Sequence, residues 1–164
     1  MKKLTCVVLC LFAFSACEKD DICVGGESVT PNVVIDLFDR LDSQLLKPAP
    51  KISIFVEGYT DTIVFRNTSK IEIPLQINTT ETVWNIRLHQ LNSSNDTILK
   101  NDQLRFTYTP EAFYVSKACG YKTVFYNFNS VKLPNTSSDG WIENIFKVTN
   151  EISNNNNAHI QIYY

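Results

Sequence analysis

The chain has 164 residues, 44% of them hydrophobic and 20% charged, so its size and composition fit one ordinary globular domain. Lys and Arg number 15 against 17 Asp and Glu. This near balance argues against a basic nucleic-acid-binding patch and against a strongly acidic tail.

The N-terminus predicts a secretory signal. Lys2 and Lys3 precede an apolar run from Leu4 to Ala16. That run is too short to cross a bilayer as a helix, and it matches the hydrophobic region of a signal peptide. No later apolar run approaches the roughly eighteen residues that a membrane-spanning helix needs. We therefore expect the mature protein not to cross a membrane.

Cys17 directly follows Phe14-Ser15-Ala16. This stretch resembles the bacterial lipoprotein box, in which the leader is cut before a cysteine that becomes acylated. A plain secretory signal with an incidental Cys17 is the alternative. Two or more acyl chains would make attachment stable, since each buried methylene contributes about 0.8 kcal/mol. The expected organisation is a signal peptide at 1–16, an acylated tether at 17–30 and a β-sandwich domain at 31–164.

A charged run follows the cysteine, comprising Glu18, Lys19, Asp20 and Asp21. It resembles the surface-export signal of lipoproteins from Bacteroidota-type bacteria. The alternative is a solvated, flexible tether that happens to be charged. We predict an outer-membrane, lipid-anchored protein that faces the cell surface, with the periplasmic face as the second choice.

The cysteine count predicts one disulfide. Cys6 and Cys10 leave with the leader and Cys17 carries lipid, so Cys23 and Cys119 remain in a compartment where disulfides persist. Their bond would close a loop of about 97 residues, for which chain entropy gives at most roughly 4–5 kcal/mol. Two buried free thiols, or one reactive thiol, are the alternatives. Cleavage leaves 13 basic and 17 acidic residues, a mature net charge near −4.

The mature chain shows apolar residues mostly at every second position, between clusters of Asn, Asp, Ser and Pro. The predicted strands are Val33–Phe38, Lys51–Val56, Lys70–Ile77, Thr82–Leu91, Thr97–Leu99, Gln103–Thr109, Tyr121–Phe128 and Ala158–Tyr164. Short strands with a turn about every ten residues predict an all-β fold. We expect a single antiparallel, immunoglobulin-like β-sandwich of about seven to eight strands, with a barrel as the alternative.

Three segments carry further expectations. Pro74 places Lys70–Ile77 at a sheet edge or a bulge. Tyr121–Phe128 is apolar on both sides, which predicts a central strand. Residues 141–152 fit a strand or an amphipathic helix capped by Asp139, and the polar loop at Ser153–Asn157 favours the strand.

Four motifs together resemble an uncharacterised family of Bacteroidota lipoproteins, a domain of unknown function. They are the start CEKDDIC, the central YVSKACGYK from Tyr114 to Lys122, Trp141-Ile142, and AHIQI from Ala158 to Ile162. The resemblance covers nearly the whole chain. It implies a small lipid-anchored envelope protein with Cys23 paired to Cys119, and it implies no activity.

The sequence contains little that predicts catalysis. His89 and His159 lie far apart, each in a predicted strand, with no metal-ligand spacing around them. No GxSxG elbow, glycine-rich phosphate loop or calcium loop is present. Asp20 and Asp21 lie on the tether, where nothing fixes the geometry that acid/base catalysis needs. We therefore expect no enzyme, no cofactor and no metal site.

Aromatic residues gather between Phe106 and Phe128. The eight are Phe106, Tyr108, Phe113, Tyr114, Tyr121, Phe125, Tyr126 and Phe128. Strand spacing favours a core role, whereas an exposed platform would suit sugar rings or a protein partner. A carrier would use the same residues to line a cavity.

Thr62 and Thr97 each lie in an Asp-Thr-Ile triplet, which resembles the O-glycosylation motif of exported Bacteroidota proteins. Both triplets fall at predicted turns or strand starts, where an enzyme could reach the hydroxyl. The function we predict is a lipid-anchored envelope binding or accessory protein with an envelope protein or glycan as partner. The alternative is an enzyme acting on envelope glycans or lipids, or a carrier of apolar ligands.

Overall fold

The computed structural model describes residues 23, 29–134 and 139–164. The chain divides into two compact units. One comprises Met1–Val29 with Tyr114–Lys122, and the other comprises Thr30–Phe113 with Thr123–Tyr164. In the described part of the chain no helix is long and apolar enough to cross a membrane.

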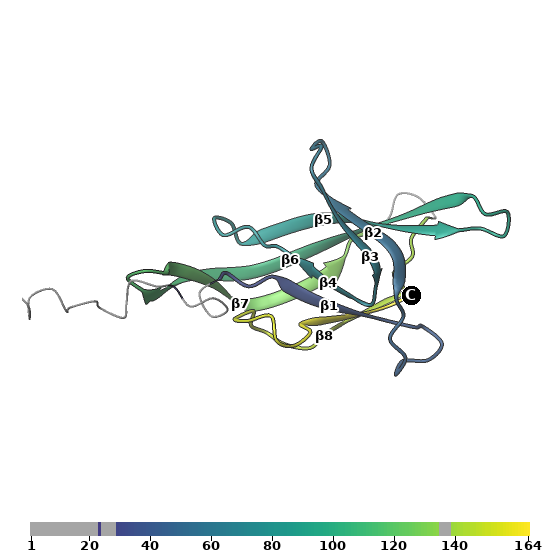
Figure 1. Cartoon of the computed structure of the whole chain (residues 1–164). Coiled ribbons are helices and arrows are strands. Elements are labelled where there is room, and N and C mark those ends of the chain that lie inside the picture. Colours follow the sequence, from purple (N-terminus) through teal and green to yellow (C-terminus); the bar gives the residue numbers. More distant parts are fainter. Residues whose placement is uncertain (1–22, 24–28, 135–138) are drawn as a thin grey trace, which may run out of the picture. The chain divides into compact units, whose positions relative to one another are not determined.

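The described residues form nine strands. These are β1 (Val33–Phe38), β2 (Ala49–Phe55), β3 (Thr62–Thr68), β4 (Lys70–Ile73), β5 (Glu81–Leu91), β6 (Thr97–Ser116), β7 (Gly120–Lys132), β8 (Asn144–Lys147) and β9 (Ile160–Tyr163). They make a four-stranded sheet, β4-β1-β9-β8, and a five-stranded sheet, β3-β2-β5-β6-β7 (Figure 1). The predicted all-β sandwich is confirmed.

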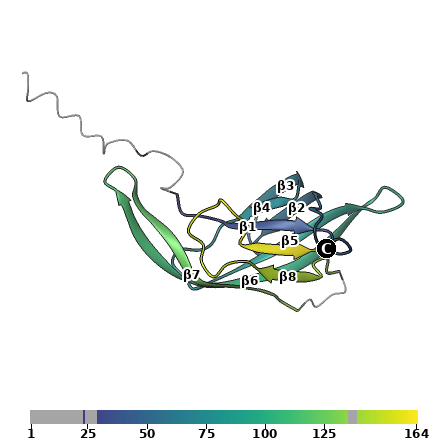
Figure 2. The ribbon, with the colours of Figure 1, turned by 90° about the horizontal axis from the view of Figure 1, so that it is seen from below.

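The four-stranded sheet contains a pairing that local patterns do not reveal. β9 runs parallel to β1, with Ile35 opposite Ile160 and Leu37 opposite Ile162, whereas β8 and β4 pair antiparallel to their neighbours. Figure 2 shows β9, in yellow, between β1 and β8. β4 is an edge strand, as Pro74 predicted, but it ends at Ile73 and does not continue to Ile77 as expected.

Alternating apolar side chains build the core between the two sheets. Ile52 and Ile54 of β2 lie opposite Leu88 and Ile86 of β5, and all four are fully buried. On β6 and β7 the aromatic residues Phe106, Tyr108, Phe125 and Phe128 join them. The rings of Phe106 and Phe128 stack at 5.9 Å, and those of Tyr108 and Phe125 meet edge to face at 5.0 Å. The core role predicted for the aromatic cluster is therefore confirmed for these four.

The prediction that Tyr121–Phe128 is a central strand is wrong, because β7 lies at the end of the five-stranded sheet. Its apolar character has another cause, because a neighbouring segment covers its outer edge. Phe125 and Ile152 exchange backbone hydrogen bonds of 3.1 and 2.9 Å, and the N–H of Phe128 donates to the carbonyl of Asn150 at 2.8 Å.

Two further strands differ from prediction. β3 was not expected, because its exposed residues lie on both faces and give no clean alternation. Thr97–Leu99 and Gln103–Thr109 belong to one continuous strand, β6. Asn101 and Asp102 lie between the two predicted strands, and both are paired in register with β5, opposite Arg87 and Ile86. Within 141–152 the structure has strand β8 and no helix.

Candidate functional site

Several predicted site residues lie outside the described residues. These are Cys17 and the run Glu18, Lys19, Asp20 and Asp21. The two candidate glycosylation sites are described, and Thr62 and Thr97 each begin a strand and are exposed. An enzyme could therefore reach both hydroxyls.

Cys23 and Cys119 form a disulfide, in agreement with the pairing predicted from the cysteine count. Their Cα atoms lie 5.0 Å apart, and 96 positions separate them in sequence. Both belong to the unit that contains Tyr114–Lys122. The bond ties the turn between β6 and β7 to Cys23.

His159 is a buried structural residue. Its Nδ1 accepts the backbone N–H of Val34 at 2.9 Å. Burial lowers the pKa of His159 below 6.5, although the backbone of Asn154 and the charge of Glu72 oppose the shift. Among the residues that the structure describes, no group of three or more His, Cys, Asp and Glu side chains could hold a metal ion.

A cluster of basic residues lies on the outer face of the five-stranded sheet. Lys51, Arg66 and Arg87 come from β2, β3 and β5. They alternate with core residues such as Ile52 and Leu88, so their side chains point away from the core. We call these three residues, with Ser53 and His89, the basic cluster.

The strand register brings the cluster together. Lys51 is directly opposite Arg66 on one side and His89 on the other, and Ser53 is directly opposite Arg87. Like charges directly opposite each other on neighbouring strands destabilise a sheet by a few tenths to about 1 kcal/mol. In the described part of the chain, no carboxylate lies within ion-pair distance of Lys51, Arg66 or Arg87. The cluster therefore presents positive charge that the fold itself does not neutralise.

Ser53 and His89 are in contact within the cluster. Ser53 Oγ and His89 Nε2 are 2.9 Å apart, and Ser53 is only 6% exposed. Burial lowers the pKa of His89 below 6.5, and the charges of Lys51, Arg87 and Arg66 lower it further. The imidazole is therefore neutral at neutral pH.

Amide side chains extend the polar surface beside the cations. The Nε of Arg87 donates to Asn101 Oδ1 at 2.6 Å, and Gln103 Nε2 donates to Asn85 Oδ1 at 2.8 Å. The guanidinium of Arg87 also lies 4.7 Å from the centre of the Phe55 ring. These contacts hold Arg87 in place, and amides next to fixed cations can bind both hydroxyl and anionic groups.

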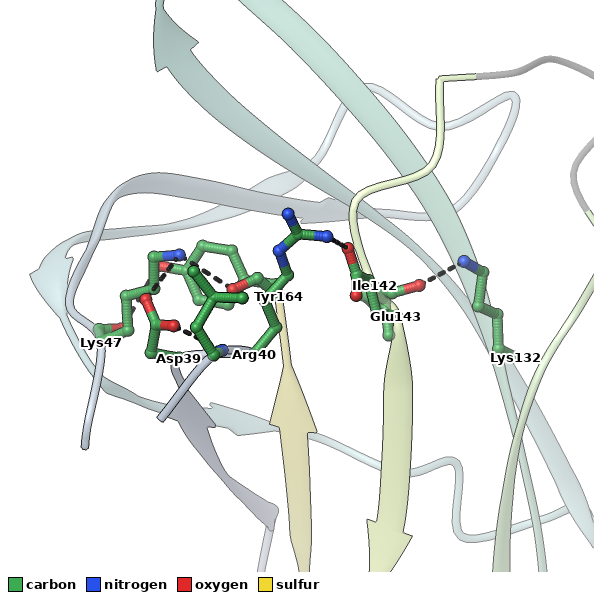
Figure 3. A network of polar contacts seen from close by, with 8 residues as sticks. Asp39, Arg40, Lys47, Lys132, Ile142, Glu143 and Tyr164 are labelled. Atoms are coloured by element: carbon green, nitrogen blue, oxygen red, sulfur yellow. Dashed lines mark hydrogen bonds and ion pairs between the residues drawn. The ribbon is translucent and has the colours of Figure 1, made fainter. Parts of the chain in front are cut away.

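A second polar region lies at one end of the four-stranded sheet, where a hollow of about 330 Å³ opens. Its lining includes Arg40, Lys47, Lys100, Trp141, Glu143 and Tyr164. Figure 3 shows that most of its charges are paired. Arg40 contacts Glu143 at 2.6 Å, and Lys47 contacts Asp39 at 3.1 Å.

Burial raises the pKa of Tyr164 to about 12, with a smaller effect from the charge of Asp39. The phenol therefore stays neutral, and Lys47 lies over its ring. Since its ion pairs are formed within the fold, this hollow is a weaker candidate for ligand binding than the basic cluster.

Asp102 holds Trp141 and Ile142, two residues that line this hollow, through hydrogen bonds to their backbone. It is only 1% exposed, and its Oδ2 accepts the backbone N–H groups of Trp141 and Ile142 at 2.7 and 2.8 Å. Its Oδ1 lies 3.0 Å from Lys132 Nζ, which also donates to the carbonyl of Ile142 (Figure 3). These contacts hold Trp141 in the core, where its indole N–H donates to the carbonyl of Ile86 at 3.1 Å.

Residues 51–164 match the model of a family of unknown function, DUF6452. The chain belongs to this family. DUF6452 membership agrees with the resemblance drawn from the sequence to an uncharacterised domain, and it assigns no activity. The matched residues include every member of the basic cluster. No curated protein and no solved structure matches the chain.

The sequence did not reveal the basic cluster, because its members are spread from Lys51 to His89 over three strands. One signal was available. Asn85, Arg87 and His89 alternate with the apolar residues of the same strand, which marks a polar outer face. The matching face of β3 could not be found, because β3 itself was not predicted.

Proposed function

We propose that the protein is a lipid-anchored component of the cell envelope that binds an acidic polysaccharide on its basic cluster. The observation that carries this proposal is the convergence of Lys51, Arg66 and Arg87 on one sheet face without carboxylate partners among the described residues. Carboxylate, sulfate and phosphate groups are natural ligands of such cations. The neighbouring Asn and Gln side chains suit sugar hydroxyls.

A flat surface built from strands supports an extended ligand better than a small molecule, which prefers a concave site. The overall charge argues against nucleic acid, since the mature chain would carry 13 basic and 17 acidic residues. An acidic glycan could bind through the local positive charge of the basic cluster, even though the whole chain is slightly acidic.

Binding is favoured over catalysis by the environment of Ser53 and His89. A Ser-His pair can act in acyl transfer when a third group orients the imidazole. Among the residues described, no hydrogen bond or ion pair joins a carboxylate to His89, and Ser53 is buried. Three cations also lower the basicity of His89. Binding is favoured over an apolar carrier because Phe106, Phe125 and Phe128 pack into the core.

The proposed membrane attachment is supported by the apolar leader and by Cys17, which together resemble a lipoprotein box. The charged run Glu18–Asp21 follows directly after it. We propose the outer membrane as the site, with the chain facing outward and the periplasmic face as the alternative. The intact mass of the purified native protein tests this. A mass equal to the bare polypeptide from residue 17 would contradict lipidation, and additional hexose masses lost in Thr62→Ala or Thr97→Ala would establish glycosylation.

The binding part is tested by affinity electrophoresis through gels that contain polygalacturonate or a neutral polysaccharide. The triple variant Lys51→Gln, Arg66→Gln, Arg87→Gln removes three contacts worth about 0.2–1 kcal/mol each. We expect roughly 3- to 150-fold weaker binding to the acidic gel. Arg40→Gln, Lys70→Gln, Lys100→Gln changes the net charge equally and is the matched control. Equal loss in both triple variants would contradict a specific site.

A further inference from the structure

The turn between β6 and β7 presents an ordered hairpin tip. β6 ends at Ser116 and β7 begins at Gly120. Gly120 has a φ of +70°, the left-handed conformation that a three-residue hairpin requires. The backbone N–H of Cys119 donates to Ser116 Oγ at 3.1 Å, which helps to fix the turn.

Two tyrosines flank this turn and are largely exposed. Tyr114 is 60% and Tyr121 is 69% exposed, and their rings meet edge to face at 5.4 Å. Lys117 and Lys122 accompany them, and the stretch from Tyr114 to Lys122 contains no acidic residue. Tyrosine is enriched where a bilayer meets water, because its ring is apolar and its hydroxyl is polar. Lysines beside such rings attract anionic headgroups by about 1 kcal/mol each.

The disulfide brings this tip close to the proposed anchor. Cys119 is bonded to Cys23, which is six positions after Cys17. Six residues span at most about 20 Å even when fully extended. The headgroup layer on each side of the hydrocarbon core is roughly 5–8 Å thick. An acylated Cys17 therefore keeps the tip within a short distance of the membrane surface at all times.

We propose that the tip, residues 114–122, contacts the phosphate-bearing lipid headgroups of the leaflet that holds the anchor. This rests on the proposed acylation of Cys17. Tyr114 and Tyr121 lie at the interface, and Lys117 and Lys122 face the phosphates. The tip is then a second, weaker membrane contact, whose effective concentration is set by the tether.

The test places a tryptophan reporter at the tip. The mature chain carrying Tyr121→Trp is attached to phosphatidylcholine vesicles that contain phosphatidylglycerol and a lipid with a nitroxide headgroup. The matched control is Tyr59→Trp, because Tyr59 is 73% exposed in the turn between β2 and β3. We expect several-fold stronger quenching of the reporter at 121 than of the reporter at 59. Equal quenching at the two positions would overturn the proposal.

Two variants separate the contribution of the lysines to the membrane contact from that of the disulfide. In the Tyr121→Trp background, Lys117→Gln with Lys122→Gln should reduce the quenching on vesicles with phosphatidylglycerol and leave it unchanged on vesicles of phosphatidylcholine alone. Replacing both Cys23 and Cys119 by Ser, which keeps Cys17 as the one thiol of the mature chain, should lower the quenching toward the value at position 59, because the tip is then no longer tied to residue 23. Unchanged quenching in both variants would contradict a tip contact that depends on the lysines and the disulfide.

The anchor and the tip are tested separately by two modes of attachment. One sample uses the natively processed protein, and its flotation with vesicles reports on acylation. The other couples the Cys17 thiol, the only one left once Cys23 and Cys119 are bonded, to a maleimide lipid. Failure of flotation would contradict the proposed anchor, whereas equal quenching at both reporters in the coupled sample would contradict the tip contact alone.

Discussion

Asp102→Ala should destabilise the protein strongly, although Asp102 is a charged residue in a strand. Its carboxylate is buried, and it accepts two backbone N–H groups and contacts Lys132. Truncation leaves two buried donors without an acceptor, at about 1–3 kcal/mol each, and removes an ion pair whose lysine side chain is 31% exposed, which adds at most about 1 kcal/mol. These costs overlap, so we expect a loss of about 4 kcal/mol in the free energy of unfolding.

The assay is thermal and urea unfolding followed by circular dichroism. For a chain of this size, 1 kcal/mol corresponds to about 2–4 °C, so Asp102→Ala should lower Tm by roughly 8–16 °C. Asp102→Asn keeps the volume and one acceptor oxygen and should have a smaller effect. Glu143→Gln is the control, because it breaks an ion pair whose side chains are 46–50% exposed and which contributes at most about 1 kcal/mol. If Asp102→Ala and Glu143→Gln had similar Tm values, the proposed role of Asp102 would be refuted.

Three other predictions follow from buried or covalent contacts. The contribution of neutral His159 to the free energy of unfolding should be complete above about pH 6.5 and should decrease below it. Burial lowers the pKa of His159 in the folded state, so the unfolded chain binds more protons as the pH falls. His159→Asn keeps an acceptor for the N–H of Val34, so it should flatten this dependence in urea titrations at about pH 7.5 and 5.5; an unchanged slope would contradict it. Lys51→Gln should raise the pKa of His89 in an NMR titration, whereas Ser53→Ala should not, because burial and the three cations set that pKa. Replacing both Cys23 and Cys119 by Ser should cost at most about 4–5 kcal/mol, and a melt unaffected by reductant would show that the bond adds no stability.

Strands with one buried face could be predicted well from the sequence. Val33–Phe38 was placed with its observed bounds, and Thr82–Leu91 differs from β5 by one residue. In both, packing against the core repeats at every second residue, so local pattern and tertiary structure agree. β3 was missed because it is an exposed edge strand, where no buried face imposes a pattern.

Long-range pairing could not be predicted from local pattern. The parallel neighbours β1 and β9 lie at opposite ends of the domain sequence, and nothing in either strand specifies the other. The buried role of Asp102 could not be predicted either, because it depends on accepting the backbone N–H groups of Trp141 and Ile142, about forty positions away. Nor could the sequence show which aromatic residues between Phe106 and Phe128 are buried. Phe106 lies in the core, whereas Tyr114 and Tyr121 are exposed.

The candidate site depends on register in the same way. Lys51, Arg66 and Arg87 carry no motif, and they converge only because β2 pairs with both β3 and β5. A one-residue slip in either pairing would move the facing residues to the opposite side of the sheet. Sequence alone could predict a polar outer face for β5, but not which charges share it.

The central claim, that the basic cluster binds an acidic glycan, is tested most directly by an NMR titration of the mature protein. The ligand is an oligogalacturonate, and a neutral oligosaccharide of the same length is the control. We predict saturable amide and side-chain shifts centred on Lys51, Ser53, Arg66, Arg87 and His89, with none from the neutral sugar. Shifts centred on the hollow beside Arg40 and Lys100, or no saturable shifts at all, would contradict the account.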